Sequence, residues 1–122
     1  MLLHNEISEK ILKAFYNVYN SLGYGFLEKV YENAMMIELR KLCMNVQRQV
    51  PIKVFYEKQL VGEYFADIIV DGKVIVELKA AESLCEAHEF PLVNYLKATE
   101  LEIGLLLNFG KKPQFRRKIF TN

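Results

Sequence analysis

Three ionisable residues interrupt two stretches of the sequence that otherwise look like buried strands. Asp67 lies within "YFADIIVDG", and Glu77 and Lys79 lie within "KVIVELKA". Side chains two positions apart on a strand point to the same face of the sheet, so Glu77 and Lys79 share a face. Charged side chains are seldom fully buried unless they are paired or functional. These three residues are therefore the first candidates for a site.

Metal chemistry would explain two carboxylates beside a lysine. Carboxylates that converge at one point need a cation between them, or one of them must take up a proton. Their oxygens suit Mg²⁺ or Mn²⁺. A nearby ammonium group can orient an attacking water or neutralise charge that develops on a phosphate. The alternative is a structural cluster in which Asp67 or Glu77 only pairs with Lys79, and the three residues alone do not separate the two.

The loop between the two strands decides whether the three groups meet. If the loop is Asp71-Gly72, Asp67 lies opposite Val76, and Glu77 faces the other side of the sheet. If the loop has three residues (71–73) and a bulge, Asp67 lies opposite Glu77 and all three groups share a face. The two-residue loop is the more common one, so the metal-site hypothesis depends on the rarer loop.

Hydrophobic periodicity places these strands in a mixed α/β fold. The pattern predicts a first helix from Asn5, which can cap it, to Gly23. A second helix is predicted over 27–42, with these residues inward: Leu27, Val30, Tyr31, Ala34 and Ile37. Strands are predicted at 46–56, 60–70, 74–80 and 103–109, a helix at 86–99, and a short last strand at 115–120. The order α-α-β-β-β-α-β-(β) indicates a mixed central β-sheet flanked by helices, and Pro51 suggests an edge position or a bulge in the first strand.

The composition indicates a globular chain with an uneven charge. The 122 residues fit one domain, 1–122, and 52% hydrophobic residues argue against disorder. Five basic groups and no acidic group lie in residues 111–122: Lys111, Lys112, Arg116, Arg117 and Lys118. A basic end could guide a polyanion, although charge alone favours an edge strand whose charges block edge-to-edge pairing.

Export and membrane insertion are not predicted. No apolar stretch approaches the length of a membrane span, and residues 1–6 lack the basic and apolar regions of a secretory signal. Cys43 and Cys85 lie far apart, so we expect both to be reduced and buried. A cytoplasmic protein is expected.

The spacing of the ionisable residues resembles a known nuclease signature. Asp67, nine intervening residues and then Glu77-Leu78-Lys79 resemble the D…(D/E)-x-K pattern of the PD-(D/E)XK nuclease superfamily. In "GFLEKVYE", Gly25, Glu28 and Tyr31 reproduce the Gly-x-x-Glu-x-x-Tyr motif that names the GxxExxY family within that superfamily. The likeness includes "RQVPI", "ADIIV", "HE…NYLK" and "GLLLNF", and so covers nearly the whole chain.

The resemblance implies a restriction-endonuclease-like core and a divalent metal, Mg²⁺ or Mn²⁺. Asp67 and Glu77 would hold the metal, Lys79 would be the catalytic lysine, and Glu28 would bind metal directly or through water. Each motif residue also has a structural explanation. A helix N-terminus favours Glu28 regardless of function, and Tyr31 can simply belong to the core.

One position departs from the family pattern. Tyr95 matches the tyrosine of a Gln-x-x-x-Tyr element, but Pro91 stands where relatives usually carry the glutamine. Proline brings no amide side chain and no backbone N–H, and is tolerated there only in the first turn of a helix.

Together these features predict a metal-dependent nuclease that hydrolyses phosphodiester bonds, with DNA as the expected substrate. The residues expected to bind substrate are Tyr95, Lys111, Lys112, Arg116 and Arg117. A domain this small covers little nucleic acid, so a homodimer or a protein partner is expected. The alternative is a binding module on a nuclease-like fold with little catalysis, which Pro91 and the net charge of +1 favour.

Overall fold

The computed structural model describes residues 4–121 and contains the predicted succession of helices and strands. The elements are α1 (Asn5–Leu22), α2 (Glu28–Lys41), β1 (Val46–Tyr56), β2 (Gln59–Val70), β3 (Val74–Lys79), the 3-10 helix η1 (Glu86–His88), α3 (Glu89–Ala98), β4 (Ile103–Phe109) and β5 (Pro113–Ile119). The strands form one sheet in the order β1-β2-β3-β4-β5. Only β3 and β4 pair in parallel, so the sheet is mixed, as predicted.

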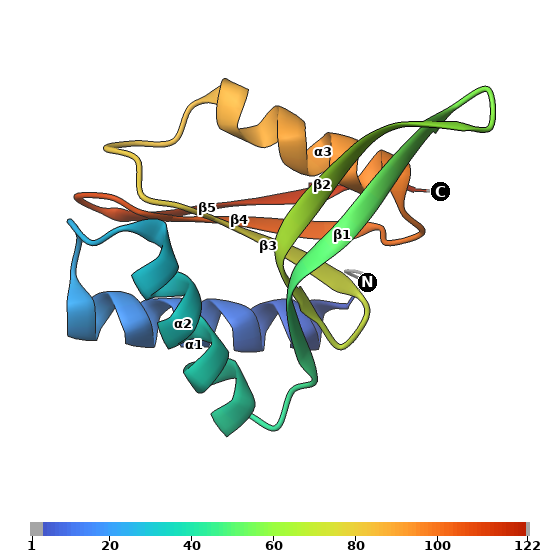
Figure 1. The fold of residues 1–122 in the computed structure, drawn as a ribbon. Coiled ribbons are helices and arrows are strands. Elements are labelled where there is room, and N and C mark those ends of the chain that lie inside the picture. Colours follow the sequence, from blue (N-terminus) through green and yellow to red (C-terminus); the bar gives the residue numbers. More distant parts are fainter. Residues whose placement is uncertain (1–3, 122) are drawn as a thin grey trace.

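Helices cover both faces of this sheet (Figure 1). The α1 and α2 helices lie on one face, over a core that includes Phe15, Met35 and Phe109. The α3 helix lies on the other face, over a smaller core that includes Leu92 and Leu106. The β4 strand is buried along its whole length because its side chains alternate between the two cores. The β1–β2 hairpin extends beyond the helices, and β1 is an edge strand, as Pro51 suggested.

The buried face of α2 differs from the prediction. Tyr31 is buried as expected, but Leu27 is 81% exposed, Ile37 is 59% exposed, and Val30 also faces outward. The residues that face inward are Tyr31, Glu32, Met35, Met36 and Leu39. The helix carries apolar residues on two stripes that share Tyr31, whose ring stacks on Phe109 with centroids 4.1 Å apart. The stripe with Met35 and Leu39 packs in the same core and is the buried one.

Two smaller predictions also need correction. Asn5 is the first residue of α1 rather than its cap, which is His4, and the Asn5 amide donates to Glu9. Cys43 and Cys85 are free thiols as predicted, but both are exposed, because each lies in a turn rather than within an element.

Residues 1–3, part of the segment inspected for a secretory signal, lie outside the described residues. Across the described part of the chain, the helices are too short or too polar to traverse a bilayer.

The β2–β3 connection adopts the rarer of the two predicted loops. Val70 pairs with Val74, which leaves Lys73 as an extra residue after the turn. The turn residues Asp71 and Gly72 have φ angles of 53° and 63°, and the Lys73 N–H donates to Val70 O at 2.9 Å. Asn45 holds Asp71 through two hydrogen bonds, at 2.7 and 2.8 Å. The bulge at Lys73 therefore sets the register on which the site depends.

Deletion of Lys73 tests the importance of this register. Without the bulge, β3 would slip by one position and turn its charged side chains towards the apolar core beneath α1 and α2. We expect the deletion to cost at least about 3 kcal/mol of unfolding free energy, the scale of an unpaired buried charge. Urea denaturation measures this cost.

The matched control is Lys73→Ala, which removes the exposed side chain and keeps the residue. It should change the unfolding free energy by less than about 0.5 kcal/mol. Equal stability of the deletion and of Lys73→Ala would contradict the role of the bulge.

Candidate active site

The β2 and β3 strands separate at Asp67 and Glu77. Backbone pairing between them ends at Ile68 and Val76, and one further step of the same register places Asp67 opposite Glu77. Beyond that point, side chains replace the backbone ladder. The Leu78 N–H donates to Asp67 Oδ2 at 2.8 Å, and the Asp67 N–H donates to Glu77 Oε1 at 3.3 Å. Each carboxylate is thus held by the backbone of the opposite strand.

This arrangement places two acidic groups together in a site of low polarity. Burial, and then the neighbouring charge of Asp67, raises the pKa of Glu77 to about 9. Lys79 acts in the opposite direction, but more weakly than those two causes. The positive charge of Lys79 therefore compensates the carboxylate pair only in part. A hard divalent cation between the carboxylates would supply the remainder.

Lys79 lies on the same strand face as Glu77 and is partly buried. Within residues 4–121 it forms no ion pair at 4.0 Å or less. This geometry does not favour the alternative in which Lys79 serves only as a salt-bridge partner for Asp67 or Glu77. The ammonium group is close enough to influence Glu77 and remains available to a third group.

Glu28 reaches the same region from the other side. It is the first residue of α2 and, with Asp67 and Leu78, lines a cavity of about 200 Å³. The loop before it depends on Gly25, whose φ of 110° suits only glycine, and on Tyr31, whose hydroxyl donates to Gly23 O at 2.7 Å. Gly25 and Tyr31 therefore act structurally, and their effect is to place Glu28 at the cavity.

The predicted metal ligands are not all gathered at one point. Among the described residues, no three side chains of His, Cys, Asp or Glu form a group able to hold a metal. Glu28 lines the rim, while Asp67 and Glu77 face each other. Two carboxylate ligands from the protein are nevertheless enough for Mg²⁺, because this ion commonly keeps several water ligands and also binds substrate phosphate. The residues present thus fit such an ion.

Sequence reasoning missed two residues of this site, Glu32 and Gln49. Glu32 is only 4% exposed and accepts hydrogen bonds from Gln49 Nε2 at 2.6 Å and from Lys29 at 3.0 Å. The same Gln49 nitrogen lies 3.5 Å from Asp67 Oδ1. Gln49 also has a φ of 51°, which is unusual for a residue other than glycine. One signal was present, because Glu32 follows Glu28 by one helical turn and shares its face.

Tyr95 lies on α3, where the charges of the carboxylate pair act on it. Burial is the main cause that raises its pKa, followed by the negative charges of Glu77 and Asp67. Its ring lies 5.5 Å from that of Tyr64 on β2. Pro91 is the third residue of α3, so it falls in the first helical turn, where proline is tolerated.

The basic residues near the C-terminus do not form one surface directed at the site. Arg116 and Lys118 both pair with Glu89 on α3, and Lys111 pairs with Glu82. Arg117 lies between Arg116 and Lys118 on β5 and so points to the opposite face. Lys112 is exposed in the β4–β5 turn. The β5 strand is an edge strand, two positions from β3 in the sheet.

Comparison with protein families agrees with this geometry. A family model described as the PD-(D/E)XK nuclease superfamily matches residues 5–118. The chain therefore belongs to the PD-(D/E)XK nuclease superfamily, and its sheet and helices form the restriction-endonuclease-like fold of that group. Comparisons with curated proteins and with solved structures gave no significant match.

The first prediction from this site concerns metal-free stability. The Glu77 pKa rises from 4.5 to about 9 on folding, so the unfolded state loses its proton first. Between these pH values, rising pH lowers the unfolding free energy, whereas below 4.5 the group has no effect. Glu77→Gln removes this ionisation. In EDTA, its melting temperature should exceed that of the wild type, and the difference should grow from pH 6 to pH 8.5.

The control is Glu63→Gln, at an exposed position of the same sheet. Its melting temperature should follow that of the wild type at every pH. A constant difference between Glu77→Gln and the wild type across this range would contradict the raised pKa of Glu77.

The second prediction concerns the hydrogen bond from Gln49, a neighbour of Asp67, to the buried Glu32. Gln49→Ala removes a donor from the buried Glu32 carboxylate and should cost about 1.5–3 kcal/mol, the range for hydrogen bonds to charged groups. Gln47→Ala, at an exposed position two residues earlier on β1, should cost less than about 0.5 kcal/mol. Urea denaturation of both variants gives the comparison, and equal costs would mean that the Gln49 contact contributes no stability.

Proposed function

We propose that this protein is a divalent-metal-dependent nuclease of the GxxExxY family and hydrolyses phosphodiester bonds in DNA. The observation that carries the proposal is the placement of Asp67 opposite Glu77 where β2 and β3 separate, with Lys79 two residues further along β3. This is the D…(D/E)-x-K spacing of the superfamily in three dimensions.

Each residue has a role that follows from its position. Asp67 and Glu77 would hold Mg²⁺ or Mn²⁺, which supplies Lewis-acid stabilisation of charge on the scissile phosphate. Lys79, on the face of Glu77, would orient the attacking water or neutralise charge that develops on the phosphate oxygens. Glu28, at the rim of the cavity beside Asp67, would complete the metal site directly or through water.

Gly25 and Tyr31 support assignment to the GxxExxY family because each has a physical reason to accompany Glu28. Gly25 provides a φ that other residues adopt only with strain, and Tyr31 anchors the turn to Gly23. The three motif residues then have one joint role, because the turn held by Gly25 and Tyr31 positions the Glu28 carboxylate at the site.

Substrate contacts are proposed at two distances from the carboxylates. Tyr95, on which the charges of Glu77 and Asp67 act, would contact the nucleotide next to the cleaved bond. Lys111, Lys112 and Arg116 would contact phosphates further away, and Arg117 would contact phosphate only on the opposite face of β5. Lys111 and Arg116 would have to exchange their contacts with Glu82 and Glu89 for a phosphate, so we expect Lys112 to contribute most. A homodimer or a protein partner would extend this limited surface.

Calorimetric titration with Mn²⁺ and Mg²⁺, combined with cleavage of single- and double-stranded DNA, tests the proposal. Glu77→Ala should lose both metal binding and cleavage. Lys79→Met should retain metal binding and lose at least about 100-fold in cleavage rate, the effect of removing one electrostatic stabiliser of the transition state. The control Glu63→Ala should retain both.

The outcomes separate the rival functions. A wild-type protein that binds neither metal would contradict the metal site, and Asp67, Glu77 and Lys79 would then be a structural cluster. Metal binding without cleavage of either DNA form would contradict the nuclease and favour the binding module.

A further inference from the structure

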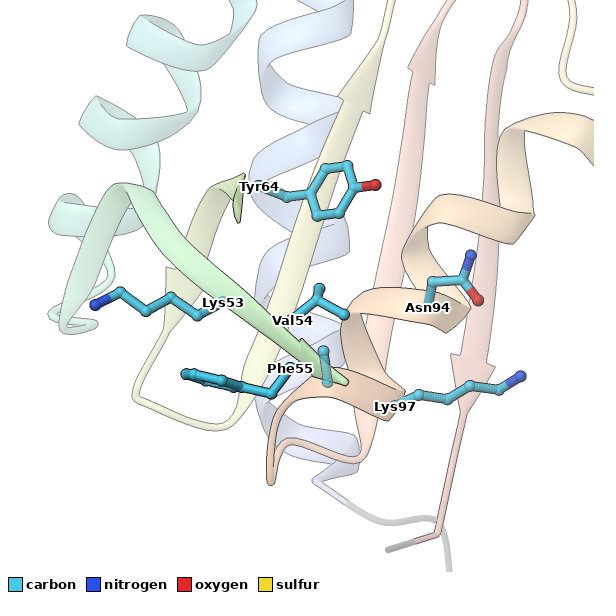
Figure 2. A pocket seen from close by; sticks show the side chains of 7 residues that line it. Lys53, Val54, Phe55, Tyr64, Asn94 and Lys97 are labelled. Atoms are coloured by element: carbon cyan, nitrogen blue, oxygen red, sulfur yellow. The ribbon is translucent and has the colours of Figure 1, made fainter. Parts of the chain in front are cut away.

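A groove lies beside the candidate active site, between the β1–β2 hairpin and α3. Its volume is about 530 Å³, and residues from β1, β2 and α3 line it. Figure 2 shows the Tyr64 ring extending from the hairpin towards α3, which carries Asn94 and Lys97 on the other side. None of the roles proposed above uses this groove.

The hairpin presents one aromatic ring to this groove. Tyr64 is 51% exposed and its ring points towards α3, whereas Phe55, which is 60% exposed, points away from α3 on the other side of the hairpin (Figure 2). Large exposed apolar groups concentrated in one place indicate a binding surface. The hairpin extends past the helices that could have covered these rings (Figure 1), so the rings contribute little to the folded core.

The charge at the groove is positive. Lys53 and Lys97 lie at its two edges, and their ammonium groups point outward (Figure 2). No acidic residue lines the groove, and the nearest acid by register is Glu63 opposite Lys53. Within residues 4–121, neither lysine has an ion pair at 4.0 Å or less, and Lys97 Nζ lies 5.9 Å from the Phe120 ring centroid. An exposed aromatic ring flanked by cations can bind single-stranded nucleic acid, the ring through a stacked base and the cations through phosphates.

The groove is continuous with the carboxylate pair. Tyr64 contacts Tyr95, with ring centroids 5.5 Å apart at 48°. Tyr64 also precedes Asp67 by three residues on the same strand, β2. A strand held along the groove would therefore reach the site where β2 and β3 separate.

We infer that this groove binds unpaired bases of a DNA single strand and directs the adjoining phosphate to Asp67 and Glu77. The inference rests on the proposed nuclease function for the position of the cleaved bond. An unpaired base can stack on Tyr64, whereas bases inside a duplex already stack on one another. The groove also has the size of a small-ligand site and is too small for a duplex.

Fluorescence anisotropy with a fluorescein-labelled oligo-dT 12-mer and with a 12-base-pair duplex tests this inference in EDTA, so that no cleavage occurs. The wild type should bind the single strand more tightly than the duplex. Tyr64→Ala should weaken binding of the single strand roughly 5- to 150-fold, the effect of losing one stacked base. Tyr64→Phe keeps the ring and should bind like the wild type.

Two further variants make the test specific. Tyr16→Ala removes an exposed tyrosine from α1, on the opposite face of the sheet, and should not change affinity. Lys97→Gln should reduce the slope of log affinity against log salt by about 0.7, the value for one phosphate contact on a single strand.

The inference fails if Tyr64→Ala binds the oligo-dT as tightly as the wild type, or if the duplex binds more tightly than the single strand. The first result would reassign the groove to another occupant, such as an extended peptide. A different result would overturn the nuclease proposal and leave the groove inference intact. In that result the wild type cleaves no DNA, but the Tyr64→Ala substitution still weakens binding of the single strand.

Discussion

The exchange of backbone for side-chain hydrogen bonds between β2 and β3 is the constraint on which the site depends. A sheet usually continues its ladder to the strand ends, and here the ladder stops after three pairs. The Asp67 and Glu77 carboxylates take over the next two hydrogen bonds. One extra residue, Lys73, makes this possible, because it determines which side chains of the two strands lie opposite each other.

This constraint places function in conflict with stability. Burial, and then the neighbouring charge of Asp67, raises the pKa of Glu77 to about 9, so at neutral pH the metal-free protein must bind a proton at Glu77 on folding, which lowers its stability. The surrounding contacts hold Asp67 beside Glu77 despite this cost. The Leu78 N–H donates to Asp67, and the Gln49 amide, 3.5 Å from Asp67, donates to the buried Glu32.

Local pattern predicted the elements well. The predicted bounds of β1 and β4 match the structure, because each is a marked run of strand-forming residues. The predicted buried face of α2 was wrong because the helix has two apolar stripes that share Tyr31, and only its packing against the rest of the fold decides which of them is buried. Glu32 and Gln49 were not predicted because their hydrogen bond depends on how β1 packs beside α2. The spacing of residues in the sequence does not encode that packing. The loop at 71–73 could be framed as a choice but not decided, because Asn45, far away in sequence, holds Asp71.

The short β2–β3 pairing also has a mechanical consequence. The β1–β2 hairpin is tied together by ten residue pairs along its own length, so it bends as a unit. Its tip lies eight residues from Asp67, or about 27 Å at the rise of a strand. Beyond Asp67, β2 therefore leaves β3 and pairs with β1 alone, while the contact between Tyr64 and Tyr95 braces the hairpin against α3. The carboxylate pair thus lies at the root of this projecting arm, where the arm joins the rest of the sheet.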